Sequence, residues 1–281
     1  MYMRKRMFGV VGHPIEHSLS PEMHNSVFRA MGLDYEYSAF DVYPEKLGAF
    51  IRRCAEENFI GLNVTIPYKI SVIEYLDKIR KEARLINAVN TIKFGHRTAV
   101  GFNTDGIGCV EALRDVGEDV RGRKILILGS GGAARAITFQ LVLEGSQLII
   151  TNRTYERALE LKKEIKEKLN KNVEVTKFSN DEIKNYIENV DILINTTPVG
   201  MFPKTRSTPI SPDLLNKDIV VMDIVYNPVE TKLIREAKKV GCKTIDGVGM
   251  FVHQGAESLR IWLDIEPPID LMRKTVLNKL K

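Results

Sequence analysis

The stretch Lys124–Thr154, KILILGSGGAARAITFQLVLEGSQLIITNRT, decides the fold of this chain. A short apolar run at 125–128 breaks into a glycine-rich turn, and an apolar stretch of helical length and a second apolar run at 148–150 follow. Strand, glycine turn, helix and strand, in that order, are typical of a dinucleotide-binding βαβ unit. We therefore predict an α/β protein that contains a Rossmann-type parallel sheet.

The glycine turn suits a bound pyrophosphate. Gly129 permits a tight turn, Gly131 lets the backbone approach a phosphate closely, and Ala134 lets the helix pack on the strand. Free N–H groups at the helix start, together with the helix dipole, favour an anion at this point. Glycine-rich turns also occur without a ligand, but the strand before this one and the helix after it favour a cofactor.

The end of the second strand favours NADP over NAD. NAD enzymes usually carry Asp or Glu there, and a carboxylate would repel a 2′-phosphate. This chain has Asn152 and Arg153 instead, with Arg157 one helical turn further on, and guanidinium groups pair with phosphate. Each arginine alone is compatible with a solvated surface charge, whereas the two together at this strand end indicate NADP. Thr154 is placed to cap the helix that begins there.

Composition and charge exclude several classes of protein. The chain has 281 residues, enough for one large domain or two ordinary ones, and no apolar stretch approaches the roughly 18 residues that span a bilayer. A net charge of +5 with interspersed signs does not indicate a nucleic-acid partner. Three widely spaced cysteines form neither a disulfide framework nor a metal pattern, which favours a cytoplasmic setting. The basic start is followed by an apolar run, but residues 12–14 (GHP) interrupt that run, so we predict a strand and not a signal peptide.

The order of predicted elements indicates two lobes. About a hundred residues precede the nucleotide unit, enough for a domain of their own, and their strands alternate with helices. Two final helices, near 250–263 and 268–280, have no obvious place on the nucleotide-binding sheet. We expect them to fold back onto the first domain, with a ligand cleft between the two lobes.

Polar groups gather after the first predicted strand. His13 and His17 have the i,i+4 spacing of zinc ligands on a helix, but Pro14 disfavours a helix and no third ligand is near, so we predict no metal. Ser18 and Ser20 lie where a helix begins, and hydroxyls with free N–H groups can hold a carboxylate. Ser20 can equally serve only as the N-cap of that helix, ahead of a proline at N1.

Three further clusters follow other strand ends. Alternation places Asn63 and Thr65 on one face of a strand, and Lys69 comes just after the proline turn that follows. Asn90 and Asp105 belong to the motifs AVNT and NTDG. Asn and Asp in loops usually stabilise turns, so none of these residues by itself indicates a binding site. Together they offer amides for binding hydroxyls, one amine and one carboxylate.

The motifs GHPIEHSLSPEMHN, NVTIPYK, AVNT, NTDG, GSGGAARA, NRTYERA, NTTPVGM and GMFVHQGAESLRIW resemble those of the shikimate dehydrogenase family, over almost the whole chain. The resemblance implies reversible NADP-linked reduction of 3-dehydroshikimate to shikimate, in the route to chorismate and the aromatic amino acids. It also implies a substrate-binding domain formed by residues 1–106 and 247–281, with an NADP-binding Rossmann domain, 107–246, inserted between its parts. Ser130 stands where Ala is commoner in the family, and we expect that departure to be harmless.

The resemblance also implies residue roles. A catalytic pair would be Lys69 and Asp105. Substrate would be bound by Ser18, Ser20, Asn63, Thr65, Asn90, Asp105, Tyr226 and Gln254. NADP would be bound by Gly129, Ser130, Gly131, Gly132, Ala133, Asn152, Arg153, Thr154, Arg157, Thr196, Thr197, Ile224 and Gly247. Hydride arriving at a ketone builds negative charge on its oxygen, which a cationic lysine can stabilise and protonate while a carboxylate orients it.

Two alternatives stay open at this stage. One is a quinate/shikimate dehydrogenase with broader substrate or NAD use, because a single hydroxyl decides that specificity. The other is a non-catalytic NADP-sensing module, against which the presence of both Lys69 and Asp105 argues. The expected partner is a small-molecule substrate, with neither nucleic acid nor membrane, and the sequence does not distinguish a monomer from a homodimer.

Overall fold

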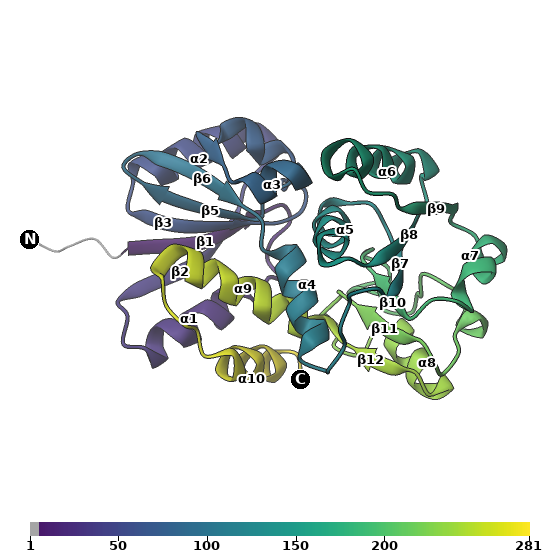
Figure 1. Cartoon of the computed structure of the whole chain (residues 1–281). Coiled ribbons are helices and arrows are strands. Elements are labelled where there is room, and N and C mark those ends of the chain that lie inside the picture. Colours follow the sequence, from purple (N-terminus) through teal and green to yellow (C-terminus); the bar gives the residue numbers. More distant parts are fainter. Residues whose placement is uncertain (1–5) are drawn as a thin grey trace, which may run out of the picture. The chain divides into compact units, whose positions relative to one another are not determined.

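The computed structural model describes residues 6–281, which divide into two compact units (Figure 1). The first unit contains the chain up to Asp105 together with Gln254–Lys279 and Lys281, and the second contains Gly106–His253 and Leu280. Residues 1–5, which hold part of the basic start considered above, lie outside the described residues. Apart from Leu280, the chain therefore enters the second unit once and returns from it once, inside helix α9 (Gly247–Leu263).

The first unit is built on a six-stranded mixed sheet with the order β2-β1-β3-β5-β6-β4. Its first three strands are parallel, β5 and β6 form the antiparallel hairpin beside β3, and β4 pairs parallel with β6. The strands are β1 (Arg6–Gly12), β2 (Tyr35–Asp41), β3 (Phe59–Val64), β4 (Lys78–Ile79), β5 (Thr91–Gly95) and β6 (Thr98–Phe102). The helices are α1 (Ser20–Ala30), α2 (Leu47–Glu56), α3 (Lys81–Ile86) and α10 (Ile269–Lys279), with 3-10 turns at Pro44–Lys46 and Ser71–Tyr75.

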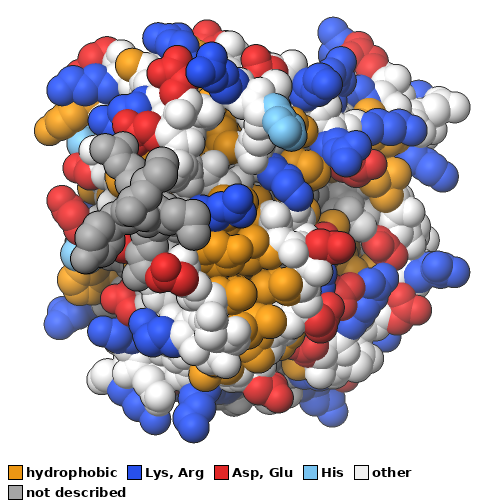
Figure 2. Space-filling view, turned by 90° about the vertical axis from the view of Figure 1, so that its left-hand side faces the viewer, with side chains coloured by type: hydrophobic (Ala, Val, Ile, Leu, Met, Phe, Trp, Pro, Cys, Tyr) orange, Lys and Arg blue, Asp and Glu red, His pale blue; other side chains and the backbone are white. Residues whose placement is uncertain are grey.

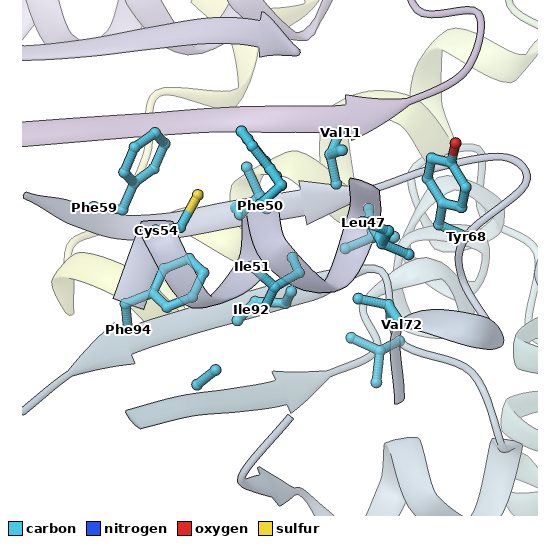
Figure 3. Close-up of a cluster of buried hydrophobic side chains, with 14 of the residues drawn as sticks. Val11, Leu47, Phe50, Ile51, Cys54, Phe59, Tyr68, Val72, Ile92 and Phe94 are labelled. Carbon is cyan, nitrogen blue, oxygen red and sulfur yellow. The ribbon is translucent and has the colours of Figure 1, made fainter. Parts of the chain in front are cut away.

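Helix α2 packs its apolar side against this sheet. Leu47, Ile51 and Cys54 recur at helical spacing, are buried, and meet side chains of the strands and of the segment after β3 (Figure 3). Full burial of such a side chain contributes roughly 1.5–3 kcal/mol. This core holds the ends of β1 and β3 in place, and those strand ends carry several of the predicted site residues.

The C-terminal helices return to the first unit, as predicted. Helix α9 (Gly247–Leu263) starts in the second unit, and its last part lies against the sheet of the first. A Cβ on Gly61 of β3 would lie 2.3 Å from the Trp262 ring, so only glycine allows this close approach. The Trp262 indole N–H donates to the Ile92 carbonyl at 2.8 Å, which fixes the helix on the sheet.

The second unit is built on a six-stranded, fully parallel sheet with the order β12-β11-β10-β7-β8-β9. The strands are β7 (Lys124–Leu128), β8 (Gln147–Asn152), β9 (Glu174–Lys177), β10 (Ile192–Asn195), β11 (Val220–Asp223) and β12 (Lys243–Ile245). The helices are α4 (Asp105–Arg114), α5 (Gly132–Glu144), α6 (Tyr155–Leu169), α7 (Asn180–Ile187) and α8 (Lys232–Val240), with a 3-10 turn at Pro212–Leu214. The strand order reverses at β7, and ligands of such sheets bind outside the carboxyl ends of the strands at this point.

Surface charge on the face drawn in Figure 2 is mixed: Lys and Arg side chains are interspersed with Asp and Glu around an apolar area. Among residues 6–281, no helix combines the length and the apolar character needed to cross a bilayer. The same residues contain no group of three or more His, Cys, Asp or Glu side chains placed to hold a metal ion.

Candidate active site

The first unit brings Lys69 and Asp105 together. The Lys69 ammonium donates to Oδ2 of Asp105 at 2.5 Å, and the two side chains are 16% and 5% exposed. Lys69 follows the turn after β3, and Asp105 is the first residue of α4, so the fold joins residues 36 positions apart. Because the pair is largely withdrawn from water, salt screens its attraction far less than that of a surface ion pair.

Asn90 fixes the other oxygen of the same carboxylate. Its side-chain amide donates to Oδ1 of Asp105 at 2.8 Å and to the Thr104 hydroxyl at 2.9 Å. Its Oδ1 accepts the Thr104 N–H at 2.8 Å and the Thr91 hydroxyl at 2.9 Å. With one donor on each oxygen, the Asp105 carboxylate is held in a single orientation toward Lys69.

Asn63 belongs to the same buried network. Its amide nitrogen donates to the Asn90 carbonyl and to the Thr91 and Ser258 hydroxyls, at 3.0–3.1 Å. Its Oδ1 accepts the Tyr37 hydroxyl at 2.7 Å. These protein contacts already use both amide protons, so one lone pair of Oδ1 is left for a ligand hydroxyl. Asn63 therefore has less capacity to bind a substrate than its sequence position indicates.

Four members of this network were not among the predicted site residues: Tyr37, Thr91, Thr104 and Ser258. Thr91 and Thr104 lie inside the motifs AVNT and NTDG, next to predicted positions. Ser258 lies one helical turn after Gln254 and donates to its carbonyl at 3.0 Å, so helical spacing on α9 was a usable signal. Burial raises the pKa of the Tyr37 phenol well above its usual range, which keeps it protonated as the donor to Asn63.

The predicted capping role of Ser20 is wrong. Helix α1 begins at Ser20 itself, its N-cap position is Leu19, and the cap makes no side-chain hydrogen bond. The Ser18 hydroxyl accepts the Ser20 N–H at 3.3 Å instead, because a turn from Ile15 to Ser18 brings that hydroxyl to the helix start. The interpretation that Ser20 is only a cap is therefore excluded.

The remaining predicted substrate residues lie in both units. Thr65 directly follows β3 and contacts the end of β1, since a Cβ on Gly12 would lie 2.6 Å from its methyl group. Gln254 is half-buried on the part of α9 that belongs to the first unit. Tyr226 belongs to the second unit, where its ring stacks on Phe251 with the centroids 4.4 Å apart.

His13 pairs with Asp41 at 2.7 Å, which gives that histidine a structural partner of its own.

The glycine turn of the second unit has the geometry of a phosphate cradle. Gly129 has φ +118°, a conformation that favours glycine, and a Cβ there would lie 2.6 Å from the Thr196 hydroxyl. Gly131 is the N-cap of α5, and a Cβ there would meet no atom within 4 Å. The first helical bond runs from the Arg135 N–H to the Gly131 carbonyl, so the N–H groups of residues 132–134 precede the helical ladder. The first turn of α5 carries no acidic residue.

Exposed arginines flank the end of β8. Arg153 and Arg157 are both exposed, and the side chain of Asn152 turns into the loop to donate to the Thr154 carbonyl at 2.8 Å. Thr154 occupies the N-cap position of α6, but its side chain makes no capping hydrogen bond, so the predicted capping contact is not formed. The basic groups at this strand end are therefore presented to solvent, where a phosphate can reach them.

The other predicted nucleotide residues lie around the carboxyl ends of β7, β10 and β11. The Thr196 hydroxyl donates to the Leu128 carbonyl at 2.6 Å, and the Thr197 hydroxyl donates to Asn195 at 2.7 Å. A Cβ on Gly247 would lie 2.5 Å from the Ile224 carbonyl, so the start of α9 touches the loop after β11. These residues and the glycine turn thus share one edge of the parallel sheet.

Comparison with known protein families matches three successive regions of the chain. The matching models are described as the shikimate dehydrogenase substrate binding domain (residues 10–92), shikimate / quinate 5-dehydrogenase (111–248) and the shikimate 5'-dehydrogenase C-terminal domain (247–277). The chain belongs to the shikimate dehydrogenase family. Its family membership and its α/β fold with a Rossmann-type domain were both predicted from the sequence and are confirmed.

Individual relatives agree over nearly their whole length. The chain is 48% identical over 279 residues to "Shikimate dehydrogenase (NADP(+))" of Methanocaldococcus jannaschii, covering 99% of this chain and 98% of that protein. A crystal structure of a shikimate dehydrogenase in complex with NADP+ is 46% identical with a TM-score of 0.94, covering 99% and 96% of the two chains. The enzyme of Thermus thermophilus in complex with NADP(H) and shikimate is 34% identical with a TM-score of 0.89, covering 97% and 99%.

Proposed function

We propose that this protein catalyses the reversible NADP-dependent reduction of 3-dehydroshikimate to shikimate. Relatives that are named NADP-dependent shikimate dehydrogenases are similar to this chain over almost its entire length, and they support both the reaction and the cofactor. The observation that carries the proposal within the molecule is the largely buried contact between Lys69 and Asp105. An ammonium and a carboxylate held in this way are the groups that reversible proton transfer at a ring hydroxyl requires.

Lys69 and Asp105 form the proposed catalytic pair. NADPH, when bound, supplies the hydride for the reduction. Lys69 then donates a hydrogen bond to the substrate oxygen on which negative charge develops, and it can deliver the proton that makes the hydroxyl. Asp105 holds the ammonium in position, and Asn90 holds Asp105, so the donor needs no rearrangement during the reaction.

Substrate binding is proposed for the polar residues at the strand ends of the first unit. Ser18 and Ser20, at the start of α1, would hold the substrate carboxylate together with Tyr226. The ring hydroxyls would contact Asn63, Thr65, Asn90, Asp105 and Gln254. The amide nitrogen and oxygen of Asn90 and the amide nitrogen of Asn63 are already engaged with protein groups, so we infer that the two residues act mainly by positioning Asp105. Of the two, only Asn63, whose Oδ1 keeps one lone pair, would accept a hydrogen bond from the substrate.

NADP binding is proposed for the second unit. Two features suit NADP. A Cβ built on Gly131, at the start of α5, would meet no atom within 4 Å, so there is room for a pyrophosphate there. Arg153 and Arg157 are exposed and can pair with the 2′-phosphate. The contacts would be made by Gly129, Ser130, Gly131, Gly132, Ala133, Asn152, Arg153, Thr154, Arg157, Thr196, Thr197, Ile224 and Gly247. Accordingly, residues 1–106 with 247–281 would act as the substrate-binding domain, and 107–246 as the NADP-binding domain.

Initial rates on a grid of two substrates and two cofactors test this proposal. Shikimate and quinate are each offered with NADP+ and with NAD+, and formation of reduced nicotinamide is followed by absorbance. We expect a rate largely confined to shikimate with NADP+. Comparable rates with quinate or NAD+ would move the protein to the broader quinate/shikimate class, and no rate in any combination would contradict an enzymatic role.

Two features outside the site complete the proposal. A cytoplasmic location is supported by the three cysteines, which are all free thiols in buried positions. We expect a monomer or a homodimer, which sedimentation would distinguish.

A further inference from the structure

A second buried polar cluster, separate from the Lys69 network, lies in the second unit. Asn195 ends β10 and Asp223 ends β11, and the two residues are direct partners in the parallel ladder. Both are 0% exposed, although each terminates a strand that is otherwise apolar. Buried polar side chains are normally kept only where they satisfy each other or fix something else in place.

The carboxylate of Asp223 joins three segments. Its Oδ1 accepts the Asn195 side-chain amide at 2.9 Å and the Val225 N–H at 3.1 Å. Its Oδ2 accepts the Thr231 hydroxyl at 2.7 Å, and that hydroxyl in turn accepts the Ile234 N–H as the N-cap of α8. One side chain therefore ties the loop after β11 to the end of β10 and to the start of α8.

Asn195 extends this connection to the loop after β10. Its Oδ1 accepts both the N–H and the hydroxyl of Thr197, at 3.0 and 2.7 Å. Its backbone carbonyl accepts the Ile224 N–H at 3.1 Å. The cluster of Asn195, Asp223 and Thr231 thus determines the course of two loops, 196–199 and 224–226, which carry the proposed ligand contacts Thr196, Thr197, Ile224 and Tyr226.

The topology indicates which half of NADP these loops would meet. The 2′-phosphate ribose belongs at the end of β8, where Arg153 lies, and the pyrophosphate belongs at the turn after β7. Since β10 and β11 lie on the opposite side of β7 from β8, their loops face the nicotinamide half.

We propose that Asp223, with Asn195 and Thr231, is a positioning residue that sets the two loops receiving the nicotinamide half of NADP, without touching the ligand itself. This inference rests on the proposed function. Burial raises the pKa of the Asp223 carboxyl to about 6, as expected for a group withdrawn from water, despite its three hydrogen-bond donors.

The test compares two ligands that share their adenosine half. Calorimetry measures the Kd of NADP+ and of adenosine 2′,5′-bisphosphate, which lacks the nicotinamide, and steady-state rates give kcat and KM for shikimate oxidation. For Asp223→Ala we expect NADP+ binding to weaken about tenfold, since buried donors lose their acceptor, and kcat to fall as well. Binding of adenosine 2′,5′-bisphosphate should stay within about twofold of the wild type, because Asp223 makes no hydrogen bond to the β8 end or to the glycine turn.

Two further variants separate positioning from general damage. Asp223→Asn keeps Oδ1 for Asn195 and Val225, so it should recover NADP+ affinity to within about threefold of the wild type. Thr231→Val removes the hydroxyl at nearly constant volume, and Thr231→Ser is its counterpart that keeps the hydroxyl. If Asp223→Ala does not fold, this pair of variants tests the positioning role instead. Asp218→Ala, at an exposed site of the same unit, serves as the neutral control.

Equal weakening of both ligands by Asp223→Ala and Thr231→Val would overturn the inference and leave the cluster a purely structural feature. Unchanged NADP+ binding and kcat in both variants would overturn it as well. If the wild-type protein bound neither ligand, the proposed function itself would fail, and this result is distinguishable because it appears before any substitution.

Discussion

The two units build their candidate sites in different ways. In the first unit, side chains hold other side chains: Asn63, Asn90 and Asp105 come from separate elements and form one buried network around Lys69. In the second unit, the proposed phosphate site consists of backbone groups, in a single turn between β7 and α5. Chemistry that needs a proton donor requires oriented side chains, whereas an anionic cofactor can be held by backbone N–H groups once glycines allow the turn that presents them. The difference predicts that single substitutions affect turnover most strongly in the first unit and cofactor choice in the second.

The largest expected effect is that of Lys69→Ala. We expect kcat to fall by roughly 10²–10⁴-fold, the usual contribution of a general acid or base, with little change in the affinity for shikimate. Steady-state rates and shikimate binding measured by calorimetry check this. Lys78→Ala, at an exposed position of the same unit, is the matched control. An unchanged kcat would remove Lys69 from the chemistry.

Two buried groups, one in each unit, should make opposite contributions to stability in acid. Burial lowers the pKa of His24 from 6.5 to about 4, so the unfolded chain takes up this proton first, and the first unit loses stability as the pH falls from about 6.5 to 4. Burial raises the pKa of Asp223 from 3.8 to about 6. The contribution of this group to the free energy of unfolding is therefore largest below about pH 4 and is lost as the pH rises to about 6. Each shift corresponds to about 3 kcal/mol.

Unfolding at several pH values from 4 to 7 measures both slopes. The single tryptophan, Trp262, lies in the first unit and reports that unit by fluorescence, while circular dichroism follows the whole chain. His24→Phe should remove the loss of stability in acid from the first unit, and Asp223→Asn should remove the opposite slope from the second. The exposed His96→Asn is the control. Slopes unaltered by the two variants would show that neither group governs its unit.

Arg153→Ala should change the choice of cofactor. Hydrogen bonds to charged groups contribute about 1.5–3 kcal/mol, so the Kd of NADP+ should rise by roughly 10–100-fold while that of NAD+ changes little. Titration calorimetry with both nucleotides, and with Arg121→Ala as the exposed control, makes the comparison. Equal losses for NADP+ and NAD+ would exclude a 2′-phosphate role for Arg153.

The smallest effect is expected from Ser258→Ala. This hydroxyl contacts Asn63 and Thr91 and reaches Asp105 only through Asn90, so kcat should fall by a few-fold, about the worth of one hydrogen bond. The KM for NADP+ should stay constant, because no cofactor contact is proposed for the first unit. Ser258→Thr, which keeps the hydroxyl, should recover part of the lost kcat. A larger change in the KM for NADP+ than in kcat would argue against an effect of Ser258 on Asp105 through Asn90.

Much of the second unit could be predicted from sequence because its signals are local. Gly129 and Gly131 stand between an apolar strand and an apolar helix, so spacing alone indicated the turn and its ligand. The cluster at Asn195 and Asp223 was missed, although a polar residue that ends an apolar strand at the carboxyl edge of a sheet is a usable signal. Strand pairing, which brings these two residues together, is not contained in either segment by itself.

The first unit was less accessible to sequence reasoning because its site is assembled from distant segments. Thr91 and Ser258 are 167 positions apart and lie 2.9 Å from each other through their hydroxyls, a contact that no local pattern encodes. Only the family resemblance joined Lys69 to Asp105. The capping role considered for Ser20 was wrong because propensity identifies a helix start only to within a residue, and here Ser18 supplies the acceptor.

A double-mutant cycle on Lys69 and Asp105 tests most directly whether the buried pair is the catalytic unit. The cycle measures kcat for the wild type, Lys69→Ala, Asp105→Asn and the double variant under saturating NADP+ and shikimate. If the two side chains act as one unit, each single substitution should cost nearly as much as both together. Additive losses would contradict that conclusion and would mean that Lys69 and Asp105 contribute to the reaction independently.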